Sequence, residues 1–454
     1  MDPDIERRDR RRGWDGRETT PSRGTSQSWA LVVLLSCTLA ACAVPEGDAK
    51  AGPDTARDGD APAEVRAGVQ VLLSDSLSLV RGKRVGLITN HSVFIPADGD
   101  GSNGNREPVS TIDALFAAPG VELVRLFGPE HGIRGEAQAG AHIEDGQDEK
   151  TGLPVFSLYG ETRRPTPEML EGIDVLVFDM EDVGARYYTY PSTMAYAMEA
   201  AGQAGIPFVV LDRPNPIRGD VVQGNVLDTA YSTFVGLYPE PMRHGMTMGE
   251  LARMFVGAFG VRVELHVVPM DGWHRDMTFD QTGLPWVPPS PNIPSLESAL
   301  AYPGTCLFEG TPLSVGRGTD RAFQQVGAPW LDGQALADTL NGYHLEGLRF
   351  VPVTFTPHGA GDGKFNDTEV HGVRLVGATS TYDAPRAAVA MLVETYRMSG
   401  DHWSWNVAHI DRLAGTDALR RGIDAGKSMA ELTADWDSQL SAFRALRAPY
   451  LLYR

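Results

Sequence analysis

A loop at residues 128–135 holds the residue types most able to do chemistry in this chain. It places Glu130, His131 and Arg134 among three glycines and one proline, directly after the apolar run 121–127. A carboxylic acid can donate or accept a proton, and a neighbouring histidine or arginine can orient the acid or bind an anion. The simpler alternative is a strand-to-helix turn in which Glu130 caps a helix or pairs with Arg134.

The same pattern, an apolar run followed by polar residues, occurs at other places in the sequence. This repetition favours a catalytic role for the loop over a simple turn. Four other apolar runs in the same half of the chain end in polar residues, at 84–88, 155–159, 175–178 and 208–211. The polar residues after these runs that we regard as site candidates are Asn90, Asp182, Arg186, Tyr188, Asp212, Arg213 and Asn215. Runs that are apolar throughout are typical of parallel strands covered on both faces. Polar residues at the carboxyl ends of such strands would meet at one edge of the sheet.

Helix signals lie between these runs. Residues 110–118 begin with Ser110 as an N-cap, residues 166–171 have an early proline, and residues 191–204 stop at Gly205. The alternation of strands and helices predicts an α/β fold with a doubly wound sheet. Motifs for dinucleotide binding, phosphate binding, serine hydrolysis and zincin chemistry are absent from the sequence. We therefore expect no cofactor. Acid–base catalysis by carboxyl groups is the kind of chemistry that remains.

The sequence pattern changes near residue 290, where a proline-rich stretch follows the last helix and strand of the first half. A capping box at residues 247–250 predicts a helix that reaches about residue 259, and a strand is predicted at 261–268. The proline-rich stretch 286–294 suits neither a helix nor a central strand, so it predicts a crossing between two domains. We place the boundary after residue 292.

Residues 293–454 are expected to form a smaller α+β domain, after a first domain at residues 67–292. Strands are predicted at 348–356 and 370–376, the first at a sheet edge because it contains Pro352, and helices are predicted at 384–398 and 429–445. The loop 307–320 contains Glu309 and Arg317 among glycines. It is either a second substrate-facing loop or a surface turn in which Glu309 pairs with Arg317.

The N-terminal segment predicts that the protein is located at a membrane. Residues 28–41 are apolar but too short to span a bilayer, and seven arginines precede them. The run ends in Leu39-Ala40-Ala41-Cys42, which resembles the lipobox of bacterial lipoproteins. We expect a signal peptide at 1–41, lipidation at Cys42 and a flexible tether at 42–66; the alternative is an ordinary signal peptide. The protein would then be extracytoplasmic and lipid-anchored, in the periplasm or at the cell surface.

The cysteine content limits the possible disulfides, and the net charge limits the possible binding partners. After loss of residues 1–41 and lipidation of Cys42, Cys306 is the one free cysteine, so no intramolecular disulfide can form. We expect Cys306 to be a small buried side chain. The formal net charge of −19 disfavours nucleic acid and an anionic membrane surface as partners. Membrane attachment would come from the lipid anchor alone.

Seven ordered motifs resemble the NamZ/YbbC family of exo-acting β-N-acetylmuramidases. They are Gly128-Pro-Glu-His-Gly132, Asp182-Val-Gly184 with Tyr188-Thr-Tyr190, Leu211-Asp-Arg-Pro-Asn-Pro216, Arg243-His-Gly-Met-Thr247, Pro289-Ser-Pro-Asn-Ile-Pro294, Glu309-Gly-Thr311 and Gly316-Arg-Gly-Thr319. The resemblance runs from about Gly68 to Tyr453. It implies a Rossmann-like N-terminal domain, a smaller C-terminal domain and an active site in the cleft between them. The family removes N-acetylmuramic acid from the non-reducing ends of peptidoglycan fragments.

Carried onto this chain, the glutamate of the first motif is Glu130, our first candidate for a catalytic carboxyl group. Glu199 and Asp182 are candidates for the second, with Asp212 and Glu309 also open. Glycoside hydrolysis needs a protonated acid and an ionised base or nucleophile, unless the sugar's own 2-acetamido carbonyl acts as the nucleophile.

The resemblance also suggests which residues contact the substrate. These candidates are Asn90, His131, Arg134, Arg186, Tyr188, Asp212, Arg213, Asn215, His244, Glu309 and Arg317. One of the four arginines could bind the lactyl carboxylate of muramic acid through a bidentate pair. Glu181 stands where the family commonly has glutamine, and beside Asp182 it would raise the pKa of one of the two carboxyl groups by repulsion.

Two other functions remain open from the sequence. A sugar-binding lipoprotein could capture peptidoglycan-derived saccharides that contain N-acetylmuramic acid without cleaving them, and it would not need Glu130. A metal-dependent hydrolase could use His91, His131 and His244, but these histidines lack the spacing of metal ligands, so we expect no metal.

Overall fold

The computed structural model describes residues 65–96, 108–130, 132–133 and 145–454. They belong to one unit of the chain, Pro62–Arg454. The expected signal peptide, Cys42, His131 and Arg134 lie outside the described residues. Within these ranges no helix is both long enough and apolar enough to cross a bilayer.

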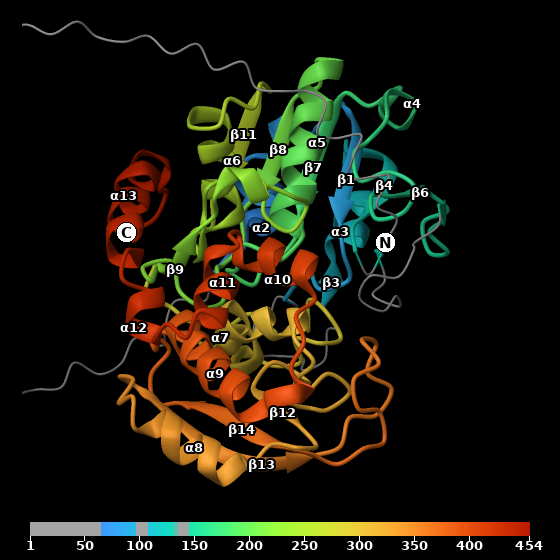
Figure 1. Cartoon of the computed structure of the whole chain (residues 1–454). Helices are drawn as coiled ribbons and strands as arrows, with labels where there is room; N and C mark the ends of the chain where they lie inside the picture. The colour runs from blue at the N-terminus through green and yellow to red at the C-terminus, as the bar shows by residue number, and fades with distance from the viewer. Residues whose placement is uncertain (1–64, 97–107, 131, 134–144) are drawn as a thin grey trace, which may run out of the picture. The chain divides into compact units, whose positions relative to one another are not determined.

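A seven-stranded sheet organises the N-terminal part, in the order β11-β8-β7-β1-β4-β6-β5 (Figure 1). Its strands are β1 Arg84–Thr89, β4 Glu122–Gly128, β5 Gly146–Gln147, β6 Pro154–Ser157, β7 Val175–Asp179, β8 Phe208–Leu211 and β11 Leu265–Val268. Neighbouring strands pair in parallel, except that β5 is antiparallel to β6. The predicted parallel layer is therefore present.

Helices cover both faces of this sheet. The helices of the N-terminal part are α2 Gly68–Asp75, α3 Thr111–Ala117, α4 Pro167–Leu170, α5 Tyr190–Ala204 and α6 Met248–Gly257. Along β7, Val175 and Val177 pack in one cluster with residues of α2 and α3, whereas Leu176 and Phe178 pack in another with residues of α5 and α6. Both faces are thus buried, which explains why the strands are apolar throughout and confirms the doubly wound fold.

The helix boundaries follow the signals in the sequence. Ser110 caps α3 by accepting a hydrogen bond from the backbone N–H of Asp113. Gly205 ends α5 in the left-handed conformation, with φ of 69°. Thr247 and Glu250 form the predicted capping box of α6. These three predictions are confirmed.

The C-terminal part combines an antiparallel sheet with helices. The sheet has the order β12-β14-β13, built from β12 Gln325–Ala328, β13 Leu348–Phe355 and β14 Val370–Gly377. The helices are α7 Leu296–Thr305, α8 Gly333–Asn341, α9 Ala384–Ser399, α10 Val407–Ala414, α11 Ala418–Asp424, α12 Met429–Leu432 and α13 Trp436–Arg447. β13 is an edge strand, as Pro352 predicted. Figure 1 shows α8 lying along β13 and β14.

Short elements complete the fold. Two-stranded pairs join β2 Phe94–Ile95 to β3 Val109–Ser110 and β9 Gln223–Val226 to β10 Pro241–Arg243. The 3-10 helices are η1 Leu77–Leu79, η2 Thr229–Tyr231, η3 Phe279–Gln281, η4 Cys306–Gly310, η5 Gly400–His402 and η6 Ala448–Tyr450. Helix α13 packs against β9, so the end of the chain returns to the N-terminal part.

Two predicted elements differ from the structure. The strand expected at 261–268 begins only at Leu265, because residues 265–268 alone pair with β8. The helix expected at 429–445 is two helices, since the chain turns at residues 433–435 between α12 and α13. The boundary predicted after residue 292 and the cleft between two domains stay predictions.

Candidate active site

Glu130 lies just beyond the carboxyl end of β4, against the start of α5. The hydroxyl of Thr189, the residue before α5, donates to Oε2 of Glu130 at 2.8 Å. The hydroxyl of Tyr190 lies 3.4 Å from the backbone oxygen of Glu130. Tyr159, which follows β6, also hydrogen-bonds to the Glu130 carboxylate. The glutamate is half-buried and is contacted by groups from two separate segments of the chain, the start of α5 and the residue pair that follows β6.

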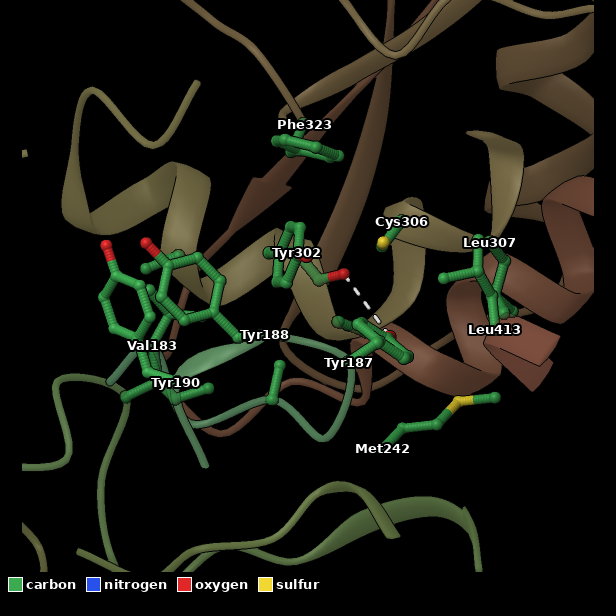
Figure 2. Packing of buried hydrophobic residues seen from close by; sticks show 14 of the residues in the cluster. Val183, Tyr187, Tyr188, Tyr190, Met242, Tyr302, Cys306, Leu307, Phe323 and Leu413 are labelled. Atoms are coloured by element: carbon green, nitrogen blue, oxygen red, sulfur yellow. Dashed lines mark hydrogen bonds between the residues drawn. The ribbon is translucent and has the colours of Figure 1, made fainter. Parts of the chain in front are cut away.

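A pair of buried tyrosines lies beside Glu130. The rings of Tyr188 and Tyr190 meet edge to face with centroids 4.7 Å apart, and both hydroxyls reach the backbone oxygen of Pro289, at 3.0 and 3.2 Å. The side-chain amide of Asn90 donates to the Tyr190 hydroxyl at 3.1 Å. Figure 2 shows the two rings side by side, with Tyr302 of α7 against Tyr188. The first strand, the loop before α5 and the proline-rich crossing therefore meet here.

Two carboxylates act on this tyrosine pair. Burial raises the pKa of Tyr188 and Tyr190 above the ordinary value, and the negative charges of Glu130 and Asp182 raise both further. Coulombic effects of this kind require proximity, so Glu130 and Asp182 lie near the same two hydroxyls. Of the five carboxyl groups that the sequence suggested, Glu130 and Asp182 are the two that act on these tyrosines.

Asp182 is held by a buried histidine. His244 Nε2 lies 3.0 Å from Asp182 Oδ2, and the backbone N–H of Gly184 donates to the same oxygen at 2.8 Å. Gly184 has φ of 77°, and a Cβ there would lie 2.6 Å from Oδ1 of Asn215, so the tight turn requires glycine. Asp182 Oδ1 is buried and has no hydrogen-bond partner among the described residues.

A second polar cluster lies at the carboxyl ends of β7 and β8. Arg213 Nη2 donates to Asp179 Oδ2 at 3.0 Å, and its Nη1 lies 3.4 Å from Oε1 of Glu181. The hydroxyl of Thr111 donates to Asp179 at 2.6 Å. Burial raises the pKa of Glu181 to about 7, with Asp179 adding to the effect and Arg213 opposing it. The expected rise at Glu181 is present, but burial and Asp179 cause it rather than Asp182.

Asp212 and Asn215 bind other parts of the protein. Asp212 Oδ2 accepts hydrogen bonds from the hydroxyls of Thr247 and Tyr453, at 2.7 and 2.6 Å. Burial raises the pKa of Asp212 to about 6, although these hydrogen bonds oppose the rise. Asn215 donates to the backbone oxygen of Met246 at 2.9 Å. These contacts fix the start of α6 and the end of the chain to β8.

Arg186 is buried and fully engaged through its two terminal nitrogens. Nη1 donates to the backbone oxygens of Asn225 and Glu240, both at 2.9 Å. Nη2 donates to the backbone oxygens of Leu413 and Ala414, at 2.9 and 3.0 Å. Burial lowers the pKa of this guanidinium to about 10. Arg186 therefore ties the β9–β10 hairpin to helix α10.

Glu309 and Arg317 form the ion pair that the sequence offered as one alternative. Arg317 Nε donates to Glu309 Oε1 at 2.8 Å, and its Nη2 contacts the same oxygen. Burial alone would raise the pKa of Glu309, but the charge and hydrogen bonds of Arg317 outweigh burial and lower it. His409 Nε2 of α10 lies 4.0 Å from the other carboxylate oxygen.

Glu199 lies farther along α5. It follows Thr189 by ten residues, which corresponds to about 15 Å along a helix. Its carboxylate pairs with Arg164 Nη1 at 2.6 Å. The structure does not bring Glu199 to Glu130.

The remaining candidates lie outside the described residues or do not converge. Nothing can be placed for His131 and Arg134. His91 Nε2 lies 3.0 Å from the backbone oxygen of Pro288, whereas His244 pairs with Asp182. Over the described ranges, no group of three or more histidine, cysteine, aspartate or glutamate side chains could hold a metal ion.

Some residues near Glu130 were missing from the sequence candidates. Tyr159 is the last residue of the predicted strand 155–159, so the strand-end rule that selected Asp182 could also have selected it. Arg163 lies in the same loop and stacks on Tyr159 and on Phe234. No signal in the sequence pointed to Thr189, because a threonine before a helix is ordinarily read as a cap.

Comparison with known proteins decides the family. A family model described as exo-β-N-acetylmuramidase NamZ, N-terminal, matches residues 85–297, and its C-terminal counterpart matches residues 300–453. A peptidoglycan β-N-acetylmuramidase NamZ from Bacillus subtilis strain 168 is 44% identical over 407 residues, which cover 89% of this chain and 95% of that protein. The chain belongs to the NamZ family. It is therefore an enzyme of the glycoside hydrolase class.

Solved structures share the NamZ fold. A crystal structure of a DUF1343 family protein from Bacteroides fragilis NCTC 9343 has a TM-score of 0.77 and 38% identity, covering 86% of this chain and 99% of that one. A second DUF1343 protein from the same strain has a TM-score of 0.68 and 31% identity, with the same coverage. The α/β architecture described above is thus shared with these two crystal structures.

Proposed function

We propose that this NamZ-family enzyme removes N-acetylmuramic acid from the non-reducing ends of peptidoglycan fragments, with Glu130 as the general acid. The observation that carries the proposal is that the hydroxyl of Thr189 holds the Glu130 carboxylate at the start of α5, beside the buried pair Tyr188 and Tyr190. Glycoside hydrolysis requires a carboxyl group that donates a proton and usually a second carboxylate, for which Asp182 is our candidate. The relative from Bacillus subtilis is named for the same reaction.

Glu130 would protonate the leaving oxygen. Its carboxylate oxygen Oε2 accepts from Thr189, and Tyr159 reaches the same carboxylate, so the side chain has a fixed orientation. A fixed donor raises the rate because the proton does not have to be positioned at the moment of reaction.

Asp182 would supply the second carboxylate. His244 and Gly184 occupy Oδ2, and Oδ1 has no hydrogen-bond partner among the described residues. From this position Asp182 can stabilise positive charge at the anomeric carbon, or accept the N–H of the 2-acetamido group when its carbonyl attacks that carbon. Neither role requires a metal or an organic cofactor.

Product analysis tests the proposed reaction directly. Peptidoglycan fragments with N-acetylmuramic acid at the non-reducing end should release that monosaccharide alone. Fragments that end in N-acetylglucosamine should stay intact. Release of internal disaccharides instead would contradict exo-action.

We also propose that the protein is lipid-anchored outside the cytoplasm through Cys42. The support is the sequence Leu39-Ala40-Ala41-Cys42 after a short apolar segment. The acidic chain gives no electrostatic reason for membrane binding, so the anchor would be covalent. In detergent phase partitioning, the wild type should enter the detergent phase and Cys42→Ala should stay in the aqueous phase. Equal partitioning would exclude the anchor.

A further inference from the structure

The arginines first suggested for binding the sugar's carboxylate are already engaged, as far as the structure describes them. Arg186 donates to four backbone oxygens, and Arg213 and Arg317 are held in ion pairs with Asp179 and Glu309. At these three residues a ligand anion would compete with existing bonds, and Arg134 lies outside the described residues. A guanidinium without a carboxylate partner among the described residues would be better placed to bind an anionic substrate.

Arg163 has the required properties. It lies in the loop that follows β6, and its guanidinium stacks over the ring of Phe234, 4.5 Å from the centroid, and over Tyr159 at 5.7 Å. Within the described ranges of the chain, it makes no hydrogen bond and no ion pair. Stacking uses the flat face of a guanidinium and leaves the N–H groups at its edge available to an acceptor.

The loop holds Arg163 in place through its neighbours. The hydroxyl of Thr162 donates to the backbone oxygen of Arg164 at 2.7 Å and accepts from the backbone N–H of Arg164 at 3.1 Å. Arg164 turns to α5, where it pairs with Glu199 and stacks over Tyr196 at 4.7 Å. Among the residues that the structure describes, Arg164 has a partner carboxylate and the adjacent Arg163 has none.

A single side chain, that of Tyr159, contacts both Arg163 and Glu130. Tyr159 hydrogen-bonds to the Glu130 carboxylate through its hydroxyl, and its ring faces the guanidinium of Arg163. In N-acetylmuramic acid the lactyl ether is at carbon 3 of the same ring that carries the scissile bond at carbon 1. A group that binds the lactyl carboxylate must therefore lie in the same sugar-binding site as the general acid.

We infer that Arg163 forms a carboxylate subsite that binds the lactyl group of N-acetylmuramic acid and sets the preference over N-acetylglucosamine. This inference rests on the proposed function, because it names the group that recognises the proposed substrate. N-Acetylglucosamine has a hydroxyl in place of the lactyl ether and would leave the guanidinium unpaired. Arg163 is a binding residue, so its loss acts on affinity for the acid and leaves the chemical step to Glu130.

Binding of the free sugar tests the inference without turnover. The full chain is titrated calorimetrically with N-acetylmuramic acid and with its methyl ester, which removes the charge and adds one methyl group. We expect the wild type to bind the acid roughly 10- to 100-fold more tightly than the ester. Arg163→Met, which keeps an apolar stem over the two rings, should bind both equally. Arg164→Met is the matched control and should keep the wild-type ratio.

Two outcomes overturn the inference: a wild type that does not distinguish acid from ester, and an Arg163→Met protein that keeps the full ratio. If Arg163→Met does not fold by circular dichroism, Arg163→Lys carries the test and should give a reduced ratio, because lysine lacks the planar fork. Hydrolysis of a β-N-acetylmuraminide by the wild type is measured in parallel. Tighter binding of the acid than of the ester, without hydrolysis, would reject the proposed function and keep the subsite. Hydrolysis without that difference in affinity would keep the proposed function and reject the subsite.

Discussion

His244 and Asp182 form a buried pair whose protonation pattern follows from one further contact. The backbone N–H of Met246 donates to Nδ1 of His244 at 3.2 Å, so Nδ1 carries no proton. The proton of the neutral imidazole is then on Nε2, which donates to Asp182 Oδ2 at 3.0 Å. The histidine thereby fixes one oxygen of the carboxylate and leaves the other, Oδ1, without a partner among the described residues.

Asp182→Asn should lower kcat by roughly 100-fold or more in a protein that still folds. The asparagine oxygen can still accept from His244 and Gly184, but the atom that takes the place of Oδ1 becomes an amide donor. Steady-state kinetics on a chromogenic β-N-acetylmuraminide measures the loss. Asp174→Asn is the control, because Asp174 precedes the opposite end of β7 and pairs with Arg84. An unchanged kcat for Asp182→Asn would remove Asp182 from the mechanism.

Arg186→Met should destabilise the protein by about 3–5 kcal/mol, since four buried carbonyl oxygens lose a charged donor. Urea unfolding monitored by fluorescence measures the change in the free energy of unfolding. Arg84→Met removes an exposed arginine from a surface ion pair and should cost far less. Comparable losses for the two variants would show that the Arg186 bonds do not hold α10 to the β9–β10 hairpin.

Glu240→Gln should make stability less dependent on pH. Burial raises the pKa of Glu240 to about 7, against the opposing charges of His244 and Arg186. Because the folded-state pKa exceeds the unfolded value, this group's stabilisation is complete below about pH 4.5 and is lost as pH rises through 7. Relative to the wild type, Glu240→Gln should gain up to about 3 kcal/mol between pH 5 and pH 8.

Urea unfolding at the two pH values measures this gain. Glu346→Gln, which alters an exposed glutamate, is the matched control and should show no such gain. A Glu240→Gln protein that follows the wild type at both pH values would mean that Glu240 is not buried as a protonated acid.

Local patterns were enough to predict most of the fold. The apolar runs that became β1, β4, β7 and β8 are short and bounded by glycine or polar residues, and α5 ends where Gly205 can adopt a left-handed conformation. Helix α7 was not predicted, because it follows a proline-rich stretch and contains Pro303. Its stability comes from packing against α9, which is not visible in a local pattern.

The site could be predicted only in part, because its pairings span long stretches of the chain. The strand-end rule selected Glu130, Asp182, Arg186 and Asp212 alike. Whether such a residue faces a substrate depends on distant partners. Arg186 bonds to Leu413, 227 residues away, and Asp212 to Tyr453, 241 residues away. The roles proposed for Glu130 and Asp182 are therefore matters for experiment.

The most direct test of the account is release of chromophore from a β-N-acetylmuraminide by the wild type and by Glu130→Gln. Glu161→Gln, an exposed glutamate in the loop after β6, serves as the control. We predict hydrolysis by the wild type and by Glu161→Gln, no hydrolysis of the matching β-N-acetylglucosaminide, and a loss of at least about 1,000-fold for Glu130→Gln. Undiminished hydrolysis by a folded Glu130→Gln protein, or a folded wild type that binds the muraminide without cleaving it, would contradict the account.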